Sequence, residues 1–351
     1  MRIERSNMGP FVRSQSAMPA SNAQFLLAAH PDGMIQTDHL RYHEVPVPSP
    51  RDNEALVKVT HISLDPAMRG WMENRGGYMA PLKVGDLMRA GCIGEIIESR
   101  NPSLPEGRLV SGTLGMQTYA VTDGTSIPVQ LLSAGTDPEV ALGMLGGTGM
   151  TAYFGLLDLG IPKPGQTVVV SGAAGATGSI AGQIARIKGC RVVGLAGTDE
   201  KCQWLTGELG FDVAINYKTD NVRDALKRAC PNGIDVYFDN VGGDILDACL
   251  ALLAMHARVV ICGGISRYNE ETLPPGPTNY FNLVFKRARM EGFIVIDYAH
   301  RFAEAATEMQ VWIKAGLLTQ RTTVIRGFEH LPQALVDLFS GVNIGKLMVC
   351  P

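Results

Sequence analysis

The sequence lacks the cysteine patterns that bind zinc or form a disulfide framework. Its seven cysteines are an odd number, stand singly along the chain, and include no C-x-x-C pair. Long apolar runs are also missing: none approaches the roughly 18 residues that a membrane span requires, and no apolar stretch follows the start "MRIERSN" as in a secretory leader. We therefore expect reduced, buried thiols in a cytoplasmic protein without a membrane anchor.

A large charge of one sign is absent as well. The net charge is −3 and 19% of the residues are charged, which argues against a nucleic-acid partner. The hydrophobic fraction of 46% is enough for full hydrophobic cores. The 351 residues suggest about two domains. Glycine, in contrast, is abundant at 40 residues, and without linker-like repeats this excess indicates tight turns and close backbone approach.

Two sequence textures divide the chain. Residues 21–140 carry short extended runs broken by proline and glycine, which predict a β-rich domain. Within residues 141–317, apolar strands alternate with helical segments, which predicts a parallel sheet covered on both faces. Residues 318–351 return to a strand–helix–strand texture, and we expect them to fold back onto the first domain and leave a cleft between two lobes. Residues 1–20 have no clear periodicity and are interpreted as an extension that is disordered, artificial or a weak targeting segment.

Six predicted strands fit a doubly wound dinucleotide-binding fold, the Rossmann fold. They cover residues 167–172, 191–196, 213–217, 234–240, 257–263 and 291–297. Helical patterns such as "GDILDACLALLAM" lie between them. The predicted fold class is therefore α/β, with ligands expected at the carboxyl ends of the strands.

The stretch "VVVSGAAGATGSIAG" (168–182) predicts a strand, a glycine turn and the start of a helix. Gly175 and Gly178 fill the second and third glycine places of G-x-G-x-x-G, whereas Ala173 stands where the first glycine is expected. Alanine fits there if its φ is negative and Gly172 takes the tightest bend. Phosphates bind over such a helix N-terminus, so this context favours a nucleotide site over a purely structural turn.

The second predicted strand selects the nucleotide. About 20 residues beyond the motif, NAD-binding chains place an acid for the ribose 2′-hydroxyl. Asp199 and Glu200 could be that acid, but they also suit the first turn of a helix capped by Thr198. Lys201 opposes the helix dipole there by a few tenths of a kcal/mol unless an anion binds it. A 2′-phosphate is such an anion, so we favour NADP(H), with a solvated surface lysine as the alternative.

Glycine-rich segments follow the fourth and fifth predicted strands, at "FDNVGG" (238–243) and "CGGISRYN" (262–269). Ligands bind at such strand ends in doubly wound sheets. We predict that Asn240 and loop amides, including those of Cys262 and Gly263, hold the nicotinamide ribose and carboxamide. Simple turn chemistry is the alternative for each glycine pair.

At this point the sequence resembles a known family, the zinc-independent medium-chain dehydrogenase/reductases, in their alkenal/one oxidoreductase branch. That branch includes leukotriene B4 12-hydroxydehydrogenases (prostaglandin reductases), alkenal double-bond reductases and curcumin reductase. The matching segments run from about residue 63 to 349 and include "SLDPAMRGWM", "MLGGTGMTAYFGLLDLG", "GAAGATGSIAGQIARIKGCRVVGLAGTDEKC", "LGFDVAINYKT", "GIDVYFDNVGG", "SRYN" and "GKLMV". The resemblance implies a GroES-like β-barrel substrate domain plus a Rossmann domain. It also implies a homodimer joined through the Rossmann edge strand, here "EGFIVID".

The resemblance also implies roles for individual residues. The implied NADP(H)-binding residues are Ala174, Gly175, Ala176, Thr177, Gly178, Lys201, Tyr217, Met150, Thr151, Asn240 and Asn343. Tyr268 is implied to be the proton donor or enolate stabiliser. Many relatives carry tyrosine where this chain has Ala67 in "DPAMRG", which implies a roomier substrate pocket with one hydroxyl fewer.

The expected chemistry needs no metal. A zinc alcohol dehydrogenase would require clustered cysteine, histidine and glutamate ligands, and Cys92 in "RAGCIGEII" has no such neighbours in sequence. The feasible step is then hydride transfer to the β-carbon of an α,β-unsaturated aldehyde or ketone, with hydrogen-bond donors for the enolate. Tyr268 or water protonates the α-carbon, unless that tyrosine merely packs on the cleft wall.

Tyr78 is predicted to line the substrate pocket, and Arg69 to brace a loop. Two other functions stay open from the residues. One is a quinone reductase with the same cofactor site, and the other is a non-catalytic NADPH-binding protein.

Overall fold

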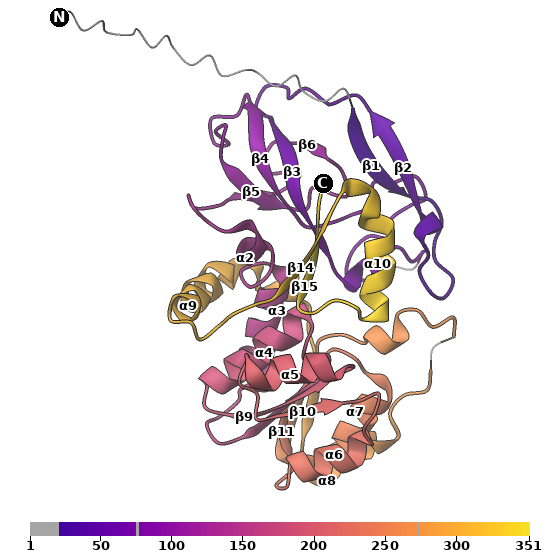
Figure 1. Ribbon diagram of the computed structural model, residues 1–351, viewed down its shortest axis with the longest axis vertical. Coiled ribbons are helices and arrows are strands. Elements are labelled where there is room, and N and C mark those ends of the chain that lie inside the picture. Colours follow the sequence, from indigo (N-terminus) through magenta and orange to yellow (C-terminus); the bar gives the residue numbers. More distant parts are fainter. Residues whose placement is uncertain (1–20, 75–76, 273) are drawn as a thin grey trace, which may run out of the picture.

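The computed structural model describes residues 21–74, 77–272 and 274–351 (Figure 1). The extension predicted for residues 1–20 lies outside the described residues. The chain forms two stacked lobes, with the N-terminal strands in the upper lobe of Figure 1 and the parallel sheet in the lower one. None of the helices in the described ranges has the length and apolar character needed to cross a membrane.

The upper lobe is built on a seven-stranded sheet. Its strand order is β14-β15-β3-β4-β5-β7, with β6 paired to β3. A separate antiparallel hairpin of β1 (Asn22–Leu27) and β2 (Leu40–Val45) lies beside it. The sheet strands are β3 (Ala55–Leu64), β4 (Cys92–Ser99), β5 (Leu109–Gly112), β6 (Tyr119–Thr122), β7 (Val129–Leu131), β14 (Thr322–Arg326) and β15 (Lys346–Cys350). The short helices α1 (Ala67–Trp71) and α2 (Pro138–Leu142) and the C-terminal helix α10 (Leu331–Ser340) complete this lobe.

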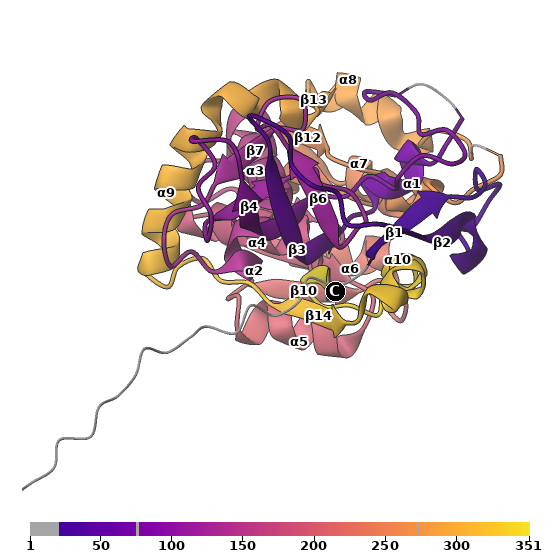
Figure 2. The ribbon, with the colours of Figure 1, turned by 90° about the horizontal axis from the view of Figure 1, so that it is seen from above.

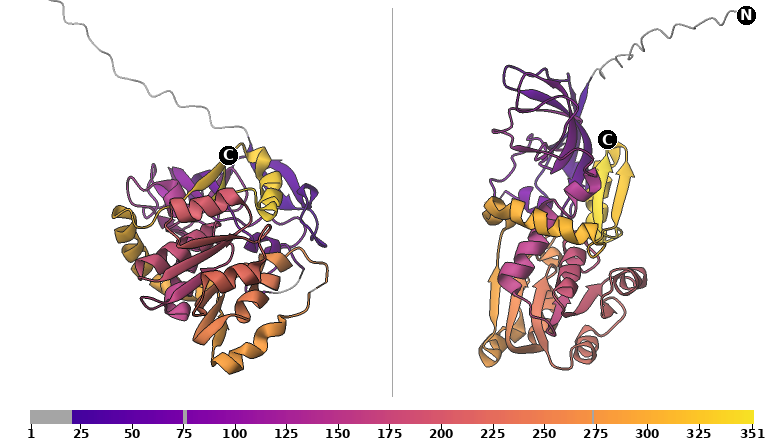
Figure 3. Two further views of the ribbon diagram at one scale, coloured as in Figure 1. Left: turned by 60° about the horizontal axis from the view of Figure 1, so that its bottom comes forward. Right: turned by 90° about the vertical axis from the view of Figure 1, so that its left-hand side faces the viewer.

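The C-terminal segment returns to the first lobe. β15 pairs antiparallel with β3 and parallel with β14, so the last two strands extend a sheet begun by the N-terminal half of the chain. Figure 3 shows these yellow strands beside the purple ones. The residue limits that we assigned to the two domains stay a prediction.

The lower lobe confirms the predicted Rossmann sheet. Its order is β10-β9-β8-β11-β12-β13 with every pair parallel, which is the doubly wound order 3-2-1-4-5-6. The strands are β8 (Thr167–Val170), β9 (Arg191–Ala196), β10 (Val213–Asn216), β11 (Ile234–Asp239), β12 (Leu253–Ile261) and β13 (Arg289–Gly292). The helices are α3 (Gly147–Phe154), α4 (Ala176–Ile187), α5 (Asp199–Gly207), α6 (Val222–Ala229), α7 (Gly243–Leu250), α8 (Asn282–Lys286) and α9 (Phe302–Lys314).

Two predicted boundaries were wrong. The sixth strand was expected at 291–297, but β13 ends at Gly292 because the apolar residues beyond it turn inward. Tyr298 stacks on Phe154 of α3 with 4.8 Å between ring centroids, and a methyl group added at Gly155 would lie 2.5 Å from the Phe293 ring. The helix expected over "GDILDACLALLAM" also stops early, because α7 ends at Leu250 and β12 already begins at Leu253.

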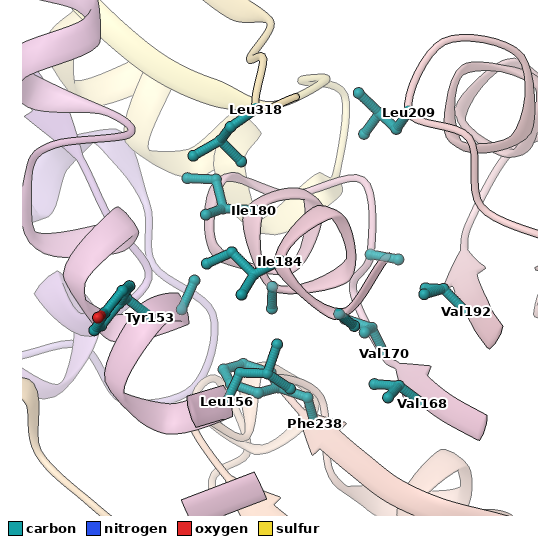
Figure 4. Packing of buried hydrophobic residues seen from close by; sticks show 14 of the residues in the cluster. Tyr153, Leu156, Val168, Val170, Ile180, Ile184, Val192, Leu209, Phe238 and Leu318 are labelled. Atoms are coloured by element: carbon teal, nitrogen blue, oxygen red, sulfur yellow. The ribbon is translucent and has the colours of Figure 1, made fainter. Parts of the chain in front are cut away.

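An apolar core packs the central strand β8 against the helix α4 (Figure 4). All four residues of β8 are buried, and Val168 and Val170 pack with Ile180 and Ile184 of α4. Burial of a β-branched strand on both faces is what a near-continuous apolar run predicts. The packing fixes the loop between β8 and α4, which was predicted to bind phosphate.

Candidate active site

The loop between β8 and α4 bends at Gly172, whose φ is +57°. Ala173 does not have a positive φ. It is buried, and its N–H donates to the carbonyl of Leu195 at 2.9 Å. An alanine therefore fits at the place where a first glycine was missing, as the sequence suggested. The tight turn is made one residue earlier.

Gly178 lets α4 pack directly on this loop. A methyl group there would lie 2.4 Å from the carbonyl oxygen of Gly172 and 2.9 Å from the Cα of Ala173. Gly175 is the N-cap and offers no side-chain acceptor, so the N–H groups of the first helical turn are left for a ligand. With the positive end of the helix dipole, these groups suit a phosphate.

The loop before β15 lies against the predicted phosphate loop. The N–H of Gly345 donates to the carbonyl of Ala174 at 2.8 Å, and Gly175 and Gly345 form an isolated bridge. Asn343 is buried, and its Nδ2 donates to the carbonyl of Gly345 at 2.9 Å. The structure thus brings the segment of Asn343 next to the loop that carries Ala174 and Gly175, while the contact of Asn343 with the nicotinamide end stays a prediction.

Lys201 is held at the start of α5. The N-cap Thr198 accepts a hydrogen bond from the Lys201 N–H at 3.2 Å, and the Lys201 ammonium donates to the carbonyl of Gly341 at 2.7 Å. Burial lowers the pKa of this ammonium, and the positive charge of Lys218 lowers it further, against an opposite effect of Glu200. Neither lysine forms an ion pair in the described part of the chain, and two positive charges that influence one another suit an anion.

Sequence reasoning missed Lys218, although it directly follows Tyr217 in "NYKT". Tyr217 directly follows β10, and its hydroxyl lies at the end of β9, where a methyl group at Gly197 would come 2.6 Å from the hydroxyl oxygen. Asp199, one of the two acids considered for a ribose, instead accepts a hydrogen bond from Asn216 Nδ2 at 2.7 Å. In this structure Asp199 is therefore engaged within the protein, whereas the ammonium of Lys201, which bonds to one carbonyl, has further donor hydrogens for an anion. Gly341, which accepts the bond from Lys201, directly follows α10. Figure 2 shows α5 and α10 on the same side of the molecule.

Ser171 joins the carboxyl ends of β8 and β11. Its hydroxyl donates to Asp239 Oδ1 at 2.8 Å and accepts from the Asn240 N–H at 2.9 Å. The Asn240 side-chain amide donates to the Ser171 carbonyl at 2.7 Å. One hydrogen of the Asn240 amide therefore bonds within the protein, and the second hydrogen and the amide oxygen remain for a ligand. Sequence reasoning missed Ser171 and Asp239, which stand within the motifs "VVVSG" and "FDNVGG".

Asp239 also organises the loop that follows β12. It is only 1% exposed, and its Oδ1 accepts from the Tyr237 hydroxyl at 2.7 Å and the Gly242 N–H at 2.9 Å. Its backbone carbonyl accepts from the N–H groups of Cys262 and Gly263 at 2.9 and 3.0 Å. These two N–H groups therefore already bond within the loop, and the predicted contact of Cys262 and Gly263 with the nicotinamide stays a prediction. Burial and the Asp239 charge raise the pKa of the Cys262 thiol to about 12.

The Tyr268 hydroxyl lies at this same edge of the sheet. It accepts a hydrogen bond from the Gly264 N–H at 3.2 Å, and a methyl group at Gly263 would lie 3.1 Å from it and 3.4 Å from the Asn240 carbonyl. Burial raises the pKa of the phenol above its usual 10.0, although the Gly264 N–H works in the opposite direction. A neutral phenol whose oxygen already accepts one bond can donate its own proton to a ligand.

Tyr78 comes from the other lobe. Its hydroxyl accepts from the Trp71 Nε1–H at 3.0 Å, and its charge is near enough to raise the pKa of Tyr268. Ala67, which stands where many relatives carry tyrosine, begins α1, and Trp71 ends it. The hydrogen bond between Trp71 and Tyr78 therefore lies one short helix from Ala67. That Tyr78 and Tyr268 line one substrate pocket stays a prediction.

Arg69 acts as the brace that its apolar surroundings suggested. Its guanidinium donates to the carbonyls of Pro31 and Gly33 at 3.2 and 3.0 Å and pairs with Glu73 at 3.3 Å. The same loop lies next to the Tyr268 segment, since a methyl group at Gly33 would come 3.2 Å from Glu271.

Met150 and Thr151 lie on α3. Met150 is buried in the lower-lobe core, and the Thr151 hydroxyl donates to the Gly147 carbonyl at 2.7 Å. Among the described residues, neither side chain hydrogen-bonds to the other predicted site residues. Their proposed contact with the nicotinamide stays a prediction that rests on the resemblance. No group of three histidine, cysteine, aspartate or glutamate side chains suited to a metal ion occurs in the described part of the chain.

Comparison with known proteins places this geometry in a class. Two family models match: "N-terminal domain of oxidoreductase" over residues 23–129 and "Zinc-binding dehydrogenase" over residues 176–310. The protein YfmJ of Bacillus subtilis is 46% identical over 336 residues, covering 95% of this chain and 98% of that protein. The "2-alkenal reductase (NADP(+)-dependent)" of Nicotiana tabacum is 40% identical, covering 95% and 98%.

Among solved structures, that of CurA in complex with NADPH from Vibrio vulnificus superposes with a TM-score of 0.89 at 39% identity, covering 93% of this chain and 98% of that one. Fold and site therefore define a medium-chain dehydrogenase/reductase. Within this superfamily the chain belongs to the alkenal/one oxidoreductase branch, as the sequence motifs suggested.

Proposed function

We propose that this protein is an NADPH-dependent reductase of the carbon–carbon double bond in α,β-unsaturated aldehydes and ketones. The observation that carries the proposal is the position of the Tyr268 hydroxyl, next to Asn240 and Gly263 at the carboxyl edge of the sheet that also presents the phosphate loop. The name of the tobacco 2-alkenal reductase and the NADPH complex of CurA support it.

The residues present fit NADPH. Gly175 and Gly178 open the backbone to a pyrophosphate, and the first turn of α4 offers its N–H groups. Lys201 and Lys218 supply two positive charges for a 2′-phosphate. Bound there, NADPH supplies a hydride to the β-carbon of the substrate. The remaining proposed contacts are Ala174, Ala176, Thr177, Tyr217, Asn240, Met150, Thr151 and Asn343.

Tyr268 completes the reduction in this proposal. Because its oxygen accepts from the Gly264 N–H, its proton is free to stabilise the enolate oxygen or to reach the α-carbon. Because the pKa of Tyr268 lies above its usual 10.0, the phenol is protonated at neutral pH and can donate its proton. Tyr78, whose hydroxyl accepts from Trp71, keeps its own proton for donation and is proposed to line the substrate pocket.

We further propose that the protein is a cytoplasmic homodimer joined at β13. Every residue of this edge strand is exposed, and the adjoining helix α8 presents exposed apolar side chains. They include Val284 and Phe285, with Phe281 directly before the helix. An unpaired strand edge flanked by apolar side chains suits pairing with a second copy. The seven free thiols suit a reducing compartment.

Steady-state oxidation of NADPH with 2-alkenals, enones and quinones tests the function, with product analysis to identify the reduced bond. We expect saturated aldehydes and ketones from the enals and enones. Faster turnover of quinones would support a quinone reductase. Tight NADPH binding without turnover of any acceptor would contradict both enzymatic functions.

A further inference from the structure

Asp239 is a buried carboxylate at the point where the strand order of the parallel sheet reverses. It ends β11, which pairs with β8, and in the order 3-2-1-4-5-6 the reversal falls between these two strands. Dinucleotides bind across the crevice outside the carboxyl ends of the strands at such a reversal. Ser171 directly follows β8 and donates to Asp239 Oδ1 at 2.8 Å, so the carboxylate lies between the two strand ends.

The two oxygens of this carboxylate have different surroundings. Oδ1 accepts four hydrogen bonds of 2.7 to 3.0 Å, from the hydroxyls of Ser171 and Tyr237 and from the N–H groups of Val241 and Gly242. Oδ2 is buried and has no hydrogen-bond partner among the described residues. No cation in the described ranges forms an ion pair with Asp239. Neutral donors alone therefore fix its position.

A carboxylate in this state is costly without a positive charge near it. Asp239 is only 1% exposed, and burial of a charge lowers stability unless the charge is paired. The four donors match the ionised form, because the oxygens of an ionised carboxylate only accept. A ligand that brings a positive charge to this edge of the sheet offsets the cost. The oxidised nicotinamide ring carries one positive charge, whereas the reduced ring carries none.

Asp239 is also joined to the residues proposed to act on the nicotinamide and the substrate. Asn240 follows it in sequence, and its backbone carbonyl accepts from the Gly263 N–H at 3.0 Å. The next N–H, that of Gly264, donates to the Tyr268 hydroxyl at 3.2 Å. A methyl group at Gly263 would lie 3.1 Å from that hydroxyl and 3.4 Å from the Asn240 carbonyl. Asp239, Asn240 and the Tyr268 hydroxyl therefore meet around Gly263.

We infer that Asp239 supplies a fixed negative charge that favours the oxidised, positively charged nicotinamide ring over the reduced ring. This assignment rests on the function proposed above, with the nicotinamide end beside Asn240. When the hydride leaves with its two electrons for the β-carbon, the ring gains one positive charge and the enolate one negative charge, which a proton from Tyr268 or water then neutralises. A negative charge at this place stabilises the ring charge and makes the bound cofactor a stronger hydride donor.

Asp239→Asn tests this role because it removes the charge and keeps the hydrogen bonds. Its amide oxygen can accept the four bonds now made to Oδ1, and its amide nitrogen replaces Oδ2, which no described donor contacts. Fluorescence titration with NADPH and competition by NADP⁺ give both dissociation constants without any substrate. The ratio of Kd for NADP⁺ to Kd for NADPH should rise roughly 3- to 30-fold in this variant.

Two control variants separate charge from structure. Asp235→Asn removes the same charge at the amino end of the same strand, where Asp235 Oδ2 accepts from the Thr167 N–H at 2.8 Å. It should leave the ratio within about two-fold. Ser171→Ala removes a hydrogen bond to Asp239 but keeps its charge, so it should change both dissociation constants by a common factor. A purely structural role of Asp239 predicts that common factor for Asp239→Asn as well.

A further measurement needs no variant. The benzamide isostere of NADP⁺ has a neutral ring, so the unchanged protein should bind NADP⁺ roughly 3- to 30-fold more tightly than the isostere. An unshifted ratio in Asp239→Asn, or an isostere bound as tightly as NADP⁺, would overturn the role of Asp239. Absence of turnover of enals, enones and quinones, together with the expected shift in the ratio, would overturn the proposed function and support the charge effect of Asp239.

Discussion

The N–H of Gly345 donates a hydrogen bond of 2.8 Å to the carbonyl of Ala174, residues that are far apart in sequence. Through this bond the loop before the last strand is fixed to the predicted phosphate loop. Gly345 has a φ of +69°, and a methyl group there would lie 2.0 Å from the carbonyl oxygen of Arg321. The contact leaves no room for a side chain.

Replacement of Gly345 by alanine should therefore weaken NADPH binding. The methyl group must displace Arg321 or the loop, which moves both Asn343 and Ala174. Gly316→Ala is the matched control, because Gly316 has a φ of +68° with open space around it. Both variants share a backbone strain of about 1–2 kcal/mol. Fluorescence titration should show a Kd for NADPH raised at least roughly 10-fold in Gly345→Ala alone; equal affinities would contradict the coupling.

Cofactor choice should depend on the two lysines at the start of α5 and the end of β10. Lys201→Ala should weaken NADPH binding roughly 10- to 100-fold and NADH binding by less than about three-fold, because only NADPH carries the 2′-phosphate. Lys218→Ala should act in the same direction with a smaller effect, since its side chain is more exposed. Lys227→Ala, on the exposed face of α6, should change neither. Equal losses for both nucleotides would mean that the lysines do not contact the 2′-phosphate.

The sequence predicted the backbone of this site better than its hydrogen bonds. The alternation of strands and helices and the bend before Ala173 follow from local patterns of apolar residues and glycine, which act over a few residues. The hydrogen bond from the Asn240 amide to the Ser171 carbonyl depends on how the ends of β8 and β11 align, and no local sequence pattern predicts that alignment. Lys218 was missed because only the folded chain shows that its charge lowers the pKa of the Lys201 ammonium.

Stability should depend on the buried pair of Lys346 and Asp65. Lys346 is 2% exposed, and its ammonium donates to Asp65 Oδ1 at 2.7 Å and to the Leu64 carbonyl at 2.9 Å. Lys346→Met leaves both acceptors without this donor and should lower the free energy of unfolding by about 3 kcal/mol. Urea denaturation measures the loss. A double-mutant cycle with Asp65→Asn should give a coupling energy well above zero, and strict additivity would contradict a direct pair.

Assembly should be sensitive to charge at α8. Phe285 is 62% exposed beside the edge strand β13, so Phe285→Glu should convert the proposed dimer into a monomer by light scattering. Val311→Glu is the matched control, because Val311 is 61% exposed on a different helix, α9. A monomer before any substitution, or dissociation by both variants alike, would contradict the proposed interface.

Proton donation by Tyr268 gives a prediction on rate and pH. Tyr268→Phe should lower kcat roughly 10- to 1,000-fold with little change in NADPH affinity. Tyr280→Phe, which removes an exposed hydroxyl, should have no effect. A raised pKa means that the protonated form persists to higher pH, so kcat of the unchanged protein should stay level from neutral pH until the pH exceeds 10. An unchanged kcat in Tyr268→Phe would assign protonation to water.

Transfer of deuterium from NADPH labelled at the reacting position of the nicotinamide tests the central claim most directly. With an enone as acceptor in ordinary water, NMR of the product should find deuterium on the former β-carbon, a solvent-derived proton on the α-carbon and an intact carbonyl group. Deuterium on the carbonyl carbon, with an unsaturated alcohol as product, would contradict the account.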